Sequence, residues 1–250
     1  MSRETLKGVI LCAGRGLRLQ GLSDGGPKCL LRLSGRTILD RCLDDFQAAG
    51  VEEIVLVAGY RRDLVERFIA DRAASGVSII VNDRFAETNT ACSLNLALRV
   101  LDSDFLLANG DVLFDRTILE DLARHPAANC VAVDADIPLE AEEVKVIGRD
   151  GWVVDIGKHL APRTCLGEAI GLYKIAREII PGLRRIYDDL EARGEFHHFF
   201  ERGFERLLAE SGGADRMFGM AFTARRPWVE IDTPEDLAYA QREIAPRLRS

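Results

Sequence analysis

The 250-residue sequence lacks the features that mark several classes of protein. No stretch approaches the ~18 apolar residues of a membrane span, and the apolar run at residues 9–13 is too short for the core of a signal peptide. There is no dense run of lysine and arginine, and the formal net charge is −7, which argues against a protein that grips nucleic-acid phosphates. We therefore expect a cytoplasmic protein with a small-molecule ligand and with neither nucleic acid nor a membrane as a partner.

Paired cysteines are missing as well. None of the six cysteines belongs to a CxxC motif, and all are scattered through predicted apolar segments: Cys12, Cys29, Cys42, Cys92, Cys130 and Cys165. This spacing predicts small buried side chains in a reducing compartment, with neither zinc nor disulfides. The hydrophobic content of 47% and the charged content of 29% are typical of a chain that buries a core. We expect one domain over residues 1–250, because a single core can reach roughly 250 residues before it splits.

Short apolar runs alternate with amphipathic stretches in the first half of the chain. They predict strands at 8–12, 54–58, 77–81 and 105–109 and helices at 37–49, 62–74 and 91–100. Because buried parallel strands need helical crossovers, this alternation predicts an α/β, Rossmann-like single domain whose mixed, mainly parallel sheet is flanked by helices. Function is then expected at the carboxyl ends of the strands.

The second half differs from this pattern. Strands predicted at 144–147 and 152–156 are joined through Asp150-Gly151, a pair that suits a hairpin turn. The sheet should therefore become mixed. Helices are predicted at 177–192 and 199–210, and a last helix should begin at Pro234 with Thr233 as its N-cap and Asp236 near N3.

The first predicted strand leads into a glycine-rich turn, Ala13-Gly14-Arg15-Gly16-Leu17-Arg18-Leu19, followed by a turn-rich segment at 21–26 and by Pro27-Lys28. Glycines there let backbone N–H groups approach a polyphosphate, and Arg18 and Lys28 add positive charge. The glycine spacing alone also fits a dinucleotide site or a structural bend. However, Leu17-Arg18 replaces the third glycine of a dinucleotide fingerprint, and Lys28 is not in a GK[ST] loop. A triphosphate is the ligand that best uses both the backbone N–H groups of the glycine-rich turn and the positive charges of Arg18 and Lys28.

Two acidic segments are candidates for a metal site. The strand predicted at 105–109 delivers Asn109-Gly110-Asp111 at its carboxyl end, where the glycine is expected to keep the approach open for a metal and a phosphate. Glu230 and Asp232 lie two residues apart on a predicted strand and so face the same side. Magnesium prefers one or two carboxylates plus phosphate oxygens. The structural alternatives are an Asp111 that closes a loop or caps a helix, and an ordinary helix start after Asp232.

These motifs resemble the sugar-nucleotidyltransferase superfamily. Its opening LAAGxGTRL, with the lysine of a PK pair ten residues after the arginine, is matched by residues 11–19 and by Lys28, although Cys12 and Leu17 replace the usual Ala and Thr. In that family a GD pair and an EIDTPEDL-like segment supply two aspartate ligands for the catalytic magnesium, which implies Asp111 and Asp232 as ligands of Mg²⁺ here. The resemblance also implies nucleotide contacts in the opening loop and on the central strand, at Leu11, Ala13, Gly14, Gly16 and Asn109.

The segment at 82–94 places a polar loop before a helix. Asn89 and Ser93 offer an amide and a hydroxyl to a base edge, although Asn89 or Thr90 also suits a helix cap. The N-x-x-x-S-L pattern resembles the cytidylyltransferase branch, which includes phosphocholine, inositol-phosphate and aminoethylphosphonate cytidylyltransferases, where this segment lies against the cytosine. Three further segments of that branch, E-x-K-V, IGK and GE-x-IG, are matched at 143–146, 156–158 and 167–171. The resemblance thus covers nearly the whole chain.

The matched segments supply candidate contacts for an acceptor. Lys158, at a strand end, is expected to bind the acceptor phosphate, with Lys145 as a second candidate that would more often be solvated. Glu168 or Asp134 is a candidate to face a cationic acceptor head. Three aromatic residues are either core or cation–π partners of such a head: Trp152, Tyr173 and Trp228. Four histidines are interpreted as surface or supporting residues, with the last two as part of a candidate acceptor lid: His125, His159, His197 and His198.

The expected reaction transfers CMP from CTP to a small phosphate- or phosphonate-bearing acceptor and releases pyrophosphate. It needs no histidine base, because a phosphate monoester with a second pKa near ~6 is largely dianionic at pH 7. Arg18 and Lys28 would neutralise the triphosphate, and Lys158 would orient the nucleophile. The alternatives are a sugar-1-phosphate nucleotidyltransferase that uses UTP, dTTP or GTP, and a non-catalytic nucleotide-binding regulator, for which so complete a charge set is unnecessary. A homodimer is compatible with either enzyme.

Overall fold

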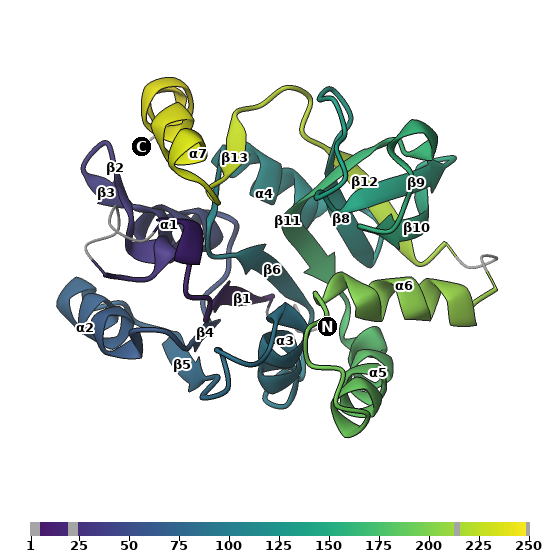
Figure 1. Ribbon diagram of the computed structural model, residues 1–250, viewed down its shortest axis with the longest axis horizontal. Helices are drawn as coiled ribbons and strands as arrows, with labels where there is room; N and C mark the ends of the chain where they lie inside the picture. Colours follow the sequence, from purple (N-terminus) through teal and green to yellow (C-terminus); the bar gives the residue numbers. More distant parts are fainter. Residues whose placement is uncertain (1–5, 20–24, 213–215, 249–250) are drawn as a thin grey trace.

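The fold is a mixed sheet with helices on both faces. The computed structural model describes residues 6–19, 25–212 and 216–248, so residues 21–24 of the predicted turn-rich segment lie outside the described residues. Within these ranges nine strands form one sheet in the order β5-β4-β1-β6-β11-β8-β12-β10-β9 (Figure 1). Their bounds are β1 Lys7–Cys12, β4 Ile54–Ala58, β5 Val77–Val81, β6 Phe105–Asn109, β8 Asn129–Asp134, β9 Lys145–Arg149, β10 Trp152–Gly157, β11 Gly167–Ile175 and β12 Phe218–Phe222.

The four strands predicted from the first half of the sequence are confirmed to within one residue. β5, β4, β1 and β6 are neighbours, and each adjacent pair runs parallel. Their crossovers use the predicted helices: α1 Ile38–Ala48, α2 Arg62–Arg72 and α3 Thr90–Leu98. Parallel strands with crossover helices bring their carboxyl ends to one edge of the sheet, which is where a ligand site is expected.

Two apolar layers cover the two faces of the sheet. On one face, α3 packs with α5 (Ile180–Ala192) and α6 (Glu201–Glu210) over side chains such as Leu11 and Leu107. On the other face, α1, α2 and α4 (Arg116–Arg124) pack over side chains such as Ile10 and Leu106. Alternate residues of β1 and β6 thus belong to opposite cores, as the twofold repeat of a strand requires.

The second half of the chain makes the sheet mixed, as expected. β11 lies antiparallel between β6 and β8, and β12 extends the sheet parallel to β8. The predicted hairpin is present as β9 and β10, and its turn residues Asp150 and Gly151 have φ values of 51° and 83°. Positive φ at both central positions matches the twist of a two-residue hairpin.

The C-terminal segment returns to the N-terminal half. The short strand β13 (Trp228–Glu230) pairs antiparallel with β7 (Val112–Phe114), and a second small ribbon joins β2 (Arg32–Leu33) to β3 (Arg36–Thr37). Helix α7 (Pro234–Tyr239) follows, continued by helical turns at Ala240–Ile244 and Ala245–Arg247. The predicted cap is confirmed, because Thr233 and Asp236 form a capping box at the start of α7.

None of the helices in the described ranges has the length and hydropathy of a membrane span. All six cysteines are free thiols, and five of them are buried.

Candidate active site

An open cleft of about 640 Å³ lies at the carboxyl ends of the parallel strands, where β1, β5 and β6 pass into loops. Most of the residues predicted for the site line this cleft: Leu11, Ala13, Gly14, Arg18, Lys28, Asn89, Ser93, Asn109, Asp111, Lys158, Glu168 and Asp232. They come from segments spread over almost the whole chain. The cleft therefore exists only in the folded protein.

A sharp turn after β6 places Asp111. The N–H of Gly110 donates a hydrogen bond to the carbonyl of Leu11 at 2.9 Å, and a Cβ at position 110 would lie 2.4 Å from Cys12 Sγ. The glycine is thus required for close packing of this turn on β1. This corrects the expectation that Gly110 serves to leave room for a metal and a phosphate.

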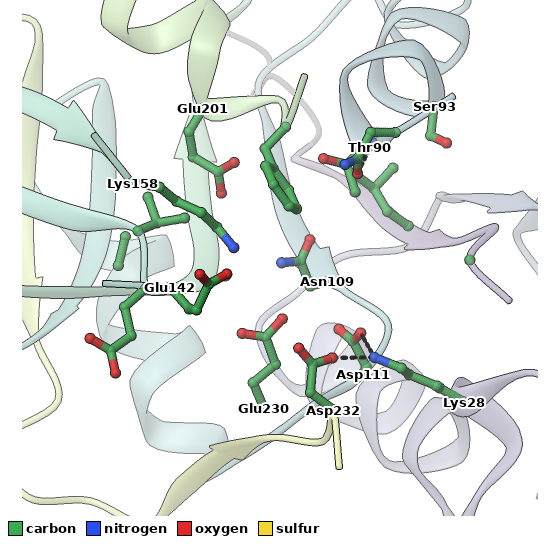
Figure 2. A pocket seen from close by; sticks show the side chains of 18 of the residues that line it. Lys28, Thr90, Ser93, Asn109, Asp111, Glu142, Lys158, Glu201, Glu230 and Asp232 are labelled. Carbon is green, nitrogen blue, oxygen red and sulfur yellow. Dashed lines mark hydrogen bonds and ion pairs between the residues drawn. The ribbon is translucent and has the colours of Figure 1, made fainter. Parts of the chain in front are cut away.

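A short ladder brings Asp232 to Asp111. In the β13–β7 pair Glu230 lies opposite Val112, and one step further the N–H of Ile231 donates to the carbonyl of Asp111 at 3.0 Å. This pairing brings one carboxylate oxygen from each of Asp111, Glu230 and Asp232 within 4.8 Å of the others. Figure 2 shows the three side chains grouped on one wall of the cleft. Two segments far apart in the sequence thus build one acidic cluster.

The ammonium of Lys28 lies between two of these carboxylates. Its Nζ donates to Asp111 Oδ2 at 3.0 Å and to Asp232 Oδ1 (Figure 2). Burial opposes the charged form of Lys28, but the attraction of the two carboxylates outweighs it and raises the pKa of Lys28. Arg18 Nη1 lies 3.5 Å from Asp232 Oδ2, with a largely exposed side chain. This wall combines acidic ligands with two cations, an arrangement suited to phosphates and a metal ion.

Gly16 does not line the cleft. It adopts a φ of +58°, and a Cβ there would lie 2.6 Å from Cγ of Lys28. Gly16 therefore supports the site indirectly and is not placed for the expected nucleotide contact. Because it has no side chain, it leaves room for the aliphatic part of Lys28.

The N-terminus of α3 forms a polar wall. Asn89 caps the helix, because its Oδ1 accepts from the N–H of Thr90 at 2.8 Å. The alternative role of helix cap is therefore confirmed for Asn89, which also lines the cleft. Ser93 is buried, and its hydroxyl accepts from Asn82 Nδ2 at 3.1 Å. Asn82, which the sequence did not single out, thus fixes the hydroxyl expected to meet a base.

Lys145 and Asp134 require correction, since neither lines the cleft. Lys145 is fully buried, and its Nζ donates to the carbonyls of Glu140, Ala141 and Glu143 at 3.3, 2.8 and 2.9 Å. Its ammonium holds a loop in place and is not available to an acceptor phosphate. Asp134 is buried as well, and its carboxylate accepts from the indole of Trp228 and from the N–H of Asp136, so it does not face an acceptor head.

The aromatic candidates are structural. Tyr173 is fully buried in the core, Trp228 donates to Asp134, and Trp152 lies under the guanidinium of Arg216 on the hairpin. The aromatic side chain beside Lys158 is instead Phe199, which lines the cleft with its ring 4.1 Å from Nζ of that lysine.

No histidine belongs to the described lining of the cleft. The pair His197–His198 lies close to it through the backbone, because Asn89 Nδ2 donates to the carbonyl of His197 at 3.4 Å and the N–H of Ala91 donates to the carbonyl of His198 at 3.2 Å. This segment is tied to the start of α3.

Two buried glutamates line the part of the cleft that contains Lys158. Glu168 on β11 is 7% exposed. Its pKa is raised to about 8, mainly by burial and in addition by the negative charges of Glu143 and Asp134. Glu201, at the start of α6, is 5% exposed, and its Oε1 accepts from the hydroxyl of Tyr173 at 2.9 Å. Burial raises the pKa of Glu201 to about 7. Both carboxyl groups are therefore held in an environment that disfavours their charge.

Glu201 was missed by the sequence reasoning, although a signal was present. It lies three residues before Phe204 and seven before Leu208, both of which are buried. This spacing puts a carboxylate on the apolar face of an amphipathic helix. An acidic residue in that position is costly to bury and therefore indicates a function.

The pKa of Glu201 leads to a stability prediction. Because the folded-state pKa of about 7 lies above the ordinary value of 4.5, the folded protein holds this proton more tightly, and the free energy of unfolding falls as the pH rises between those values. We expect Glu201→Gln to remove this component, so that between pH 5 and pH 8 the variant loses about 2 kcal/mol less stability than the wild type. Urea unfolding at both pH values measures the difference.

Glu205→Gln is the matched control, since Glu205 lies one turn along α6 and is paired with Arg202 at 2.5 Å. It should follow the wild-type pH dependence. An identical pH dependence in Glu201→Gln would show that the Glu201 carboxyl is not desolvated.

The sequence of residues 8–199 matches the family described as the MobA-like NTP transferase domain. The chain belongs to this family. Among the relatives of this NTP transferase domain is the CMP-5′-(3-aminopropyl)phosphonate synthase of Streptomyces rubellomurinus, which is 31% identical over 96% of this chain and 39% of the relative. The bifunctional IPC transferase and DIPP synthase of Rubrobacter xylanophilus is 32% identical over 97% of this chain and 52% of its own length. The domain thus spans about half or less of these two relatives.

A third relative is similar over its full length. The CTP:phosphoglutamine cytidylyltransferase of Campylobacter jejuni is 23% identical over 93% of this chain and 98% of its own. Together these relatives confirm the resemblance to nucleotidyltransferases of the cytidylyltransferase branch that was drawn from the motifs.

Solved structures confirm the fold class. The inositol-1-phosphate CTP transferase from T. maritima superimposes with a TM-score of 0.79 at 20% identity, over 99% of this NTP transferase domain and 97% of that chain. The CTP:phosphocholine cytidylyltransferase from Streptococcus pneumoniae superimposes with a TM-score of 0.80 at 19% identity, over 95% and 98% of the two chains.

Proposed function

We propose that this protein transfers CMP from CTP to a small acceptor that carries a phosphate or a phosphonate, with release of pyrophosphate. The observation that carries the proposal is the meeting of Asp111, Asp232 and Lys28 on one wall of the cleft. Carboxylates with a lysine suit a metal-bound triphosphate, and the α3 wall supplies polar groups for a base. Membership of the NTP transferase family gives the same class of chemistry.

The acidic cluster fits Mg²⁺. Three carboxylates with oxygens within 4.8 Å of one another form a compact oxygen donor set, which suits a small, hard cation. We propose that Asp111 and Asp232 hold the ion, with Glu230 beside it. When bound, the ion would neutralise negative charge on the reacting phosphates.

In the proposed reaction an acceptor oxygen forms a bond to the α-phosphorus of CTP. The bond from that phosphorus to the bridging oxygen of the β-phosphate breaks, and pyrophosphate leaves with the electron pair. Lys28 and Arg18 would stabilise charge on the triphosphate and the leaving group, and Lys158 would orient the attacking oxygen. The acceptor oxygen is already ionised near pH 7, so no side chain has to remove a proton from it.

The choice of cytosine rests on two supports. Relatives named as a CTP-dependent cytidylyltransferase and as a synthase of a CMP-linked phosphonate match this chain over nearly its whole length. The buried hydroxyl of Ser93 and the amide of Asn89 also line the wall expected to meet the base.

The six free cysteines support a reducing compartment, so we place the protein in the cytoplasm.

The test is pyrophosphate release with Mg²⁺, one nucleotide at a time and a panel of acceptors: phosphocholine, 2-aminoethylphosphonate, inositol 1-phosphate and glucose 1-phosphate. We expect kcat/KM for CTP to exceed that for UTP, GTP and dTTP by at least about tenfold, since one well-placed hydrogen bond to the base supplies that difference. Chelation of the metal should abolish release.

Two other results would reassign the protein. A preference for UTP, GTP or dTTP with glucose 1-phosphate would make it a sugar-1-phosphate nucleotidyltransferase. Binding of CTP without pyrophosphate release from any acceptor would instead favour a regulatory nucleotide-binding protein.

A further inference from the structure

The cleft has a second charged wall, which the transfer chemistry does not require. Figure 2 shows Glu201 and Glu142 on the side away from Lys28, with the ammonium of Lys158 between them. In the described lining, five carboxylates form this wall: Glu140, Glu142, Glu143, Glu168 and Glu201. They face the place where the proposed function puts a phosphate-bearing acceptor, although like charges repel such an anion.

Glu201 carries the strongest evidence that the wall binds something. It is 5% exposed, and among the described residues its Oε2 has no hydrogen-bond partner. An unpaired buried carboxylate oxygen costs stability, and a fold keeps such a group where a ligand uses it. The carboxylate interacts with the hydroxyl of Tyr173 at Oε1 and with the backbone of Glu201 itself, and Oε2 stays available to another donor.

Glu168 adds a second carboxylate of the same kind. It is 7% exposed on β11 and pairs with no cation of the described residues at ion-pair distance, although Lys145 and Lys158 attract its charge from further away. Burial disfavours the charge of both carboxyl groups, so a cation bound against them would lower their pKa values and stabilise their charged forms.

The lysines of this region do not neutralise the wall. The ammonium of Lys145 donates to three backbone carbonyls of the loop that carries Glu140 and Glu143, so it fixes the acidic loop without an ion pair to a carboxylate. Lys158 is the one cation in this part of the described lining, and its Nζ lies over the ring of Phe199 without an ion pair. One ammonium faces three solvent-accessible carboxylates of the 140–143 loop as well as the two buried carboxyl groups, so the wall keeps a net negative charge.

Phe199 gives this wall an aromatic face that already contacts an ammonium group. Its ring is 40% exposed and lies 4.1 Å from Nζ of Lys158, which is a cation–π contact with a primary ammonium. Carboxylates beside an aromatic face form the usual environment for an alkylammonium group, because the ring attracts the cation without hydrogen-bonding to it.

We propose that the acceptor carries an ammonium group at the end remote from its phosphate or phosphonate, and that Glu201, Glu168 and the ring of Phe199 bind that group. The inference rests on the proposed function for the phosphate end alone. Lys158 lies between the two ends, where it separates the acidic wall from the acceptor phosphate. A polyol or sugar phosphate fits this wall poorly, because hydroxyl groups do not compensate two buried carboxylates.

The inference is tested with two pairs of acceptors that differ only in charge. The pairs are phosphoethanolamine with 2-hydroxyethyl phosphate, and phosphocholine with its uncharged analogue 3,3-dimethylbutyl phosphate. Calorimetry with Mg²⁺ and a non-hydrolysable CTP analogue measures binding, and pyrophosphate release with CTP is measured separately. In at least one pair we expect the cationic member to bind about tenfold or more tightly than the neutral one.

Glu201→Gln is nearly isosteric and keeps an oxygen for Tyr173. It should reduce the preference for the cation to less than about threefold while leaving the affinity of the neutral member within about twofold, and Glu168→Gln should act in the same direction. Glu205→Gln, one turn along α6, should retain the full preference. Circular dichroism confirms that each variant is folded.

No preference for the cation in either pair, including no measurable binding, would overturn the inference, as would an equal loss for both members in Glu201→Gln. A cationic preference in binding without pyrophosphate release would uphold the inference and contradict the proposed function. Pyrophosphate release with equal use of both members would do the reverse.

Discussion

Asp111→Asn is expected to lower kcat for pyrophosphate release by about 10³-fold, because the amide removes one of two charged ligands from the proposed magnesium site and several kcal/mol of charge stabilisation with it. The fold should survive. Asp111 joins the C-terminal segment through its backbone carbonyl, which accepts from the N–H of Ile231 and is unaffected by the substitution. A thermal unfolding midpoint within a few degrees of the wild type, together with lost turnover, is the combined expected outcome.

Asp232→Asn should have a similar effect, and the double variant should be little worse than either single one, because residues that act on one ion are strongly non-additive. Asp102→Asn is the matched surface control, since Asp102 is highly exposed and pairs only with Lys7 among the described residues. It should release pyrophosphate at the wild-type rate. Undiminished release by Asp111→Asn would remove the metal assignment.

The parallel half of the fold was predictable because its strands are continuous apolar runs bounded by turns. β1, β4 and β6 are buried on both faces, β5 is the half-buried edge strand, and amphipathic helices separate all four, so the sequence pattern leaves little choice. β8 and β12 were not predicted. Each is a short apolar run without a crossover pattern. β8 has its place through pairing with β11, which inserts antiparallel between β6 and β8, and β12 has its place through pairing with β8.

The candidate site also contains residues that the sequence predicts and residues whose environment only the folded structure reveals. Asp111 and Asp232 were predictable from motifs, because each follows a strand at a point where the chain must turn. The environment of Lys145 was not predictable, since only the tertiary path of the 140–143 loop brings three carbonyls around its ammonium. Glu201 was predictable in principle from its place on an apolar helix face. Its unpaired oxygen depends on packing against β11.

The position of Lys28 leads to a prediction in which metal affinity and turnover change in opposite directions. In this structure its ammonium is the cation between Asp111 and Asp232, so a divalent ion that binds those carboxylates must compete with it. Lys28→Met removes the competitor and should tighten the binding of Mn²⁺ in the absence of nucleotide by about tenfold, measured by electron paramagnetic resonance. The same variant should lose about 10²- to 10³-fold in kcat, because a charge that stabilises the departing pyrophosphate is missing.

Lys7→Met separates this effect from a general change in charge. Lys7 also bridges two carboxylates, those of Glu53 and Asp102, but it lies at the opposite end of β1 from the cleft. It should change neither metal affinity nor turnover. If Lys28→Met weakened Mn²⁺ binding, the lysine would be organising the carboxylates for the metal and not competing with it. The proposal that the Lys28 ammonium competes with the metal ion for Asp111 and Asp232 would then have to be abandoned.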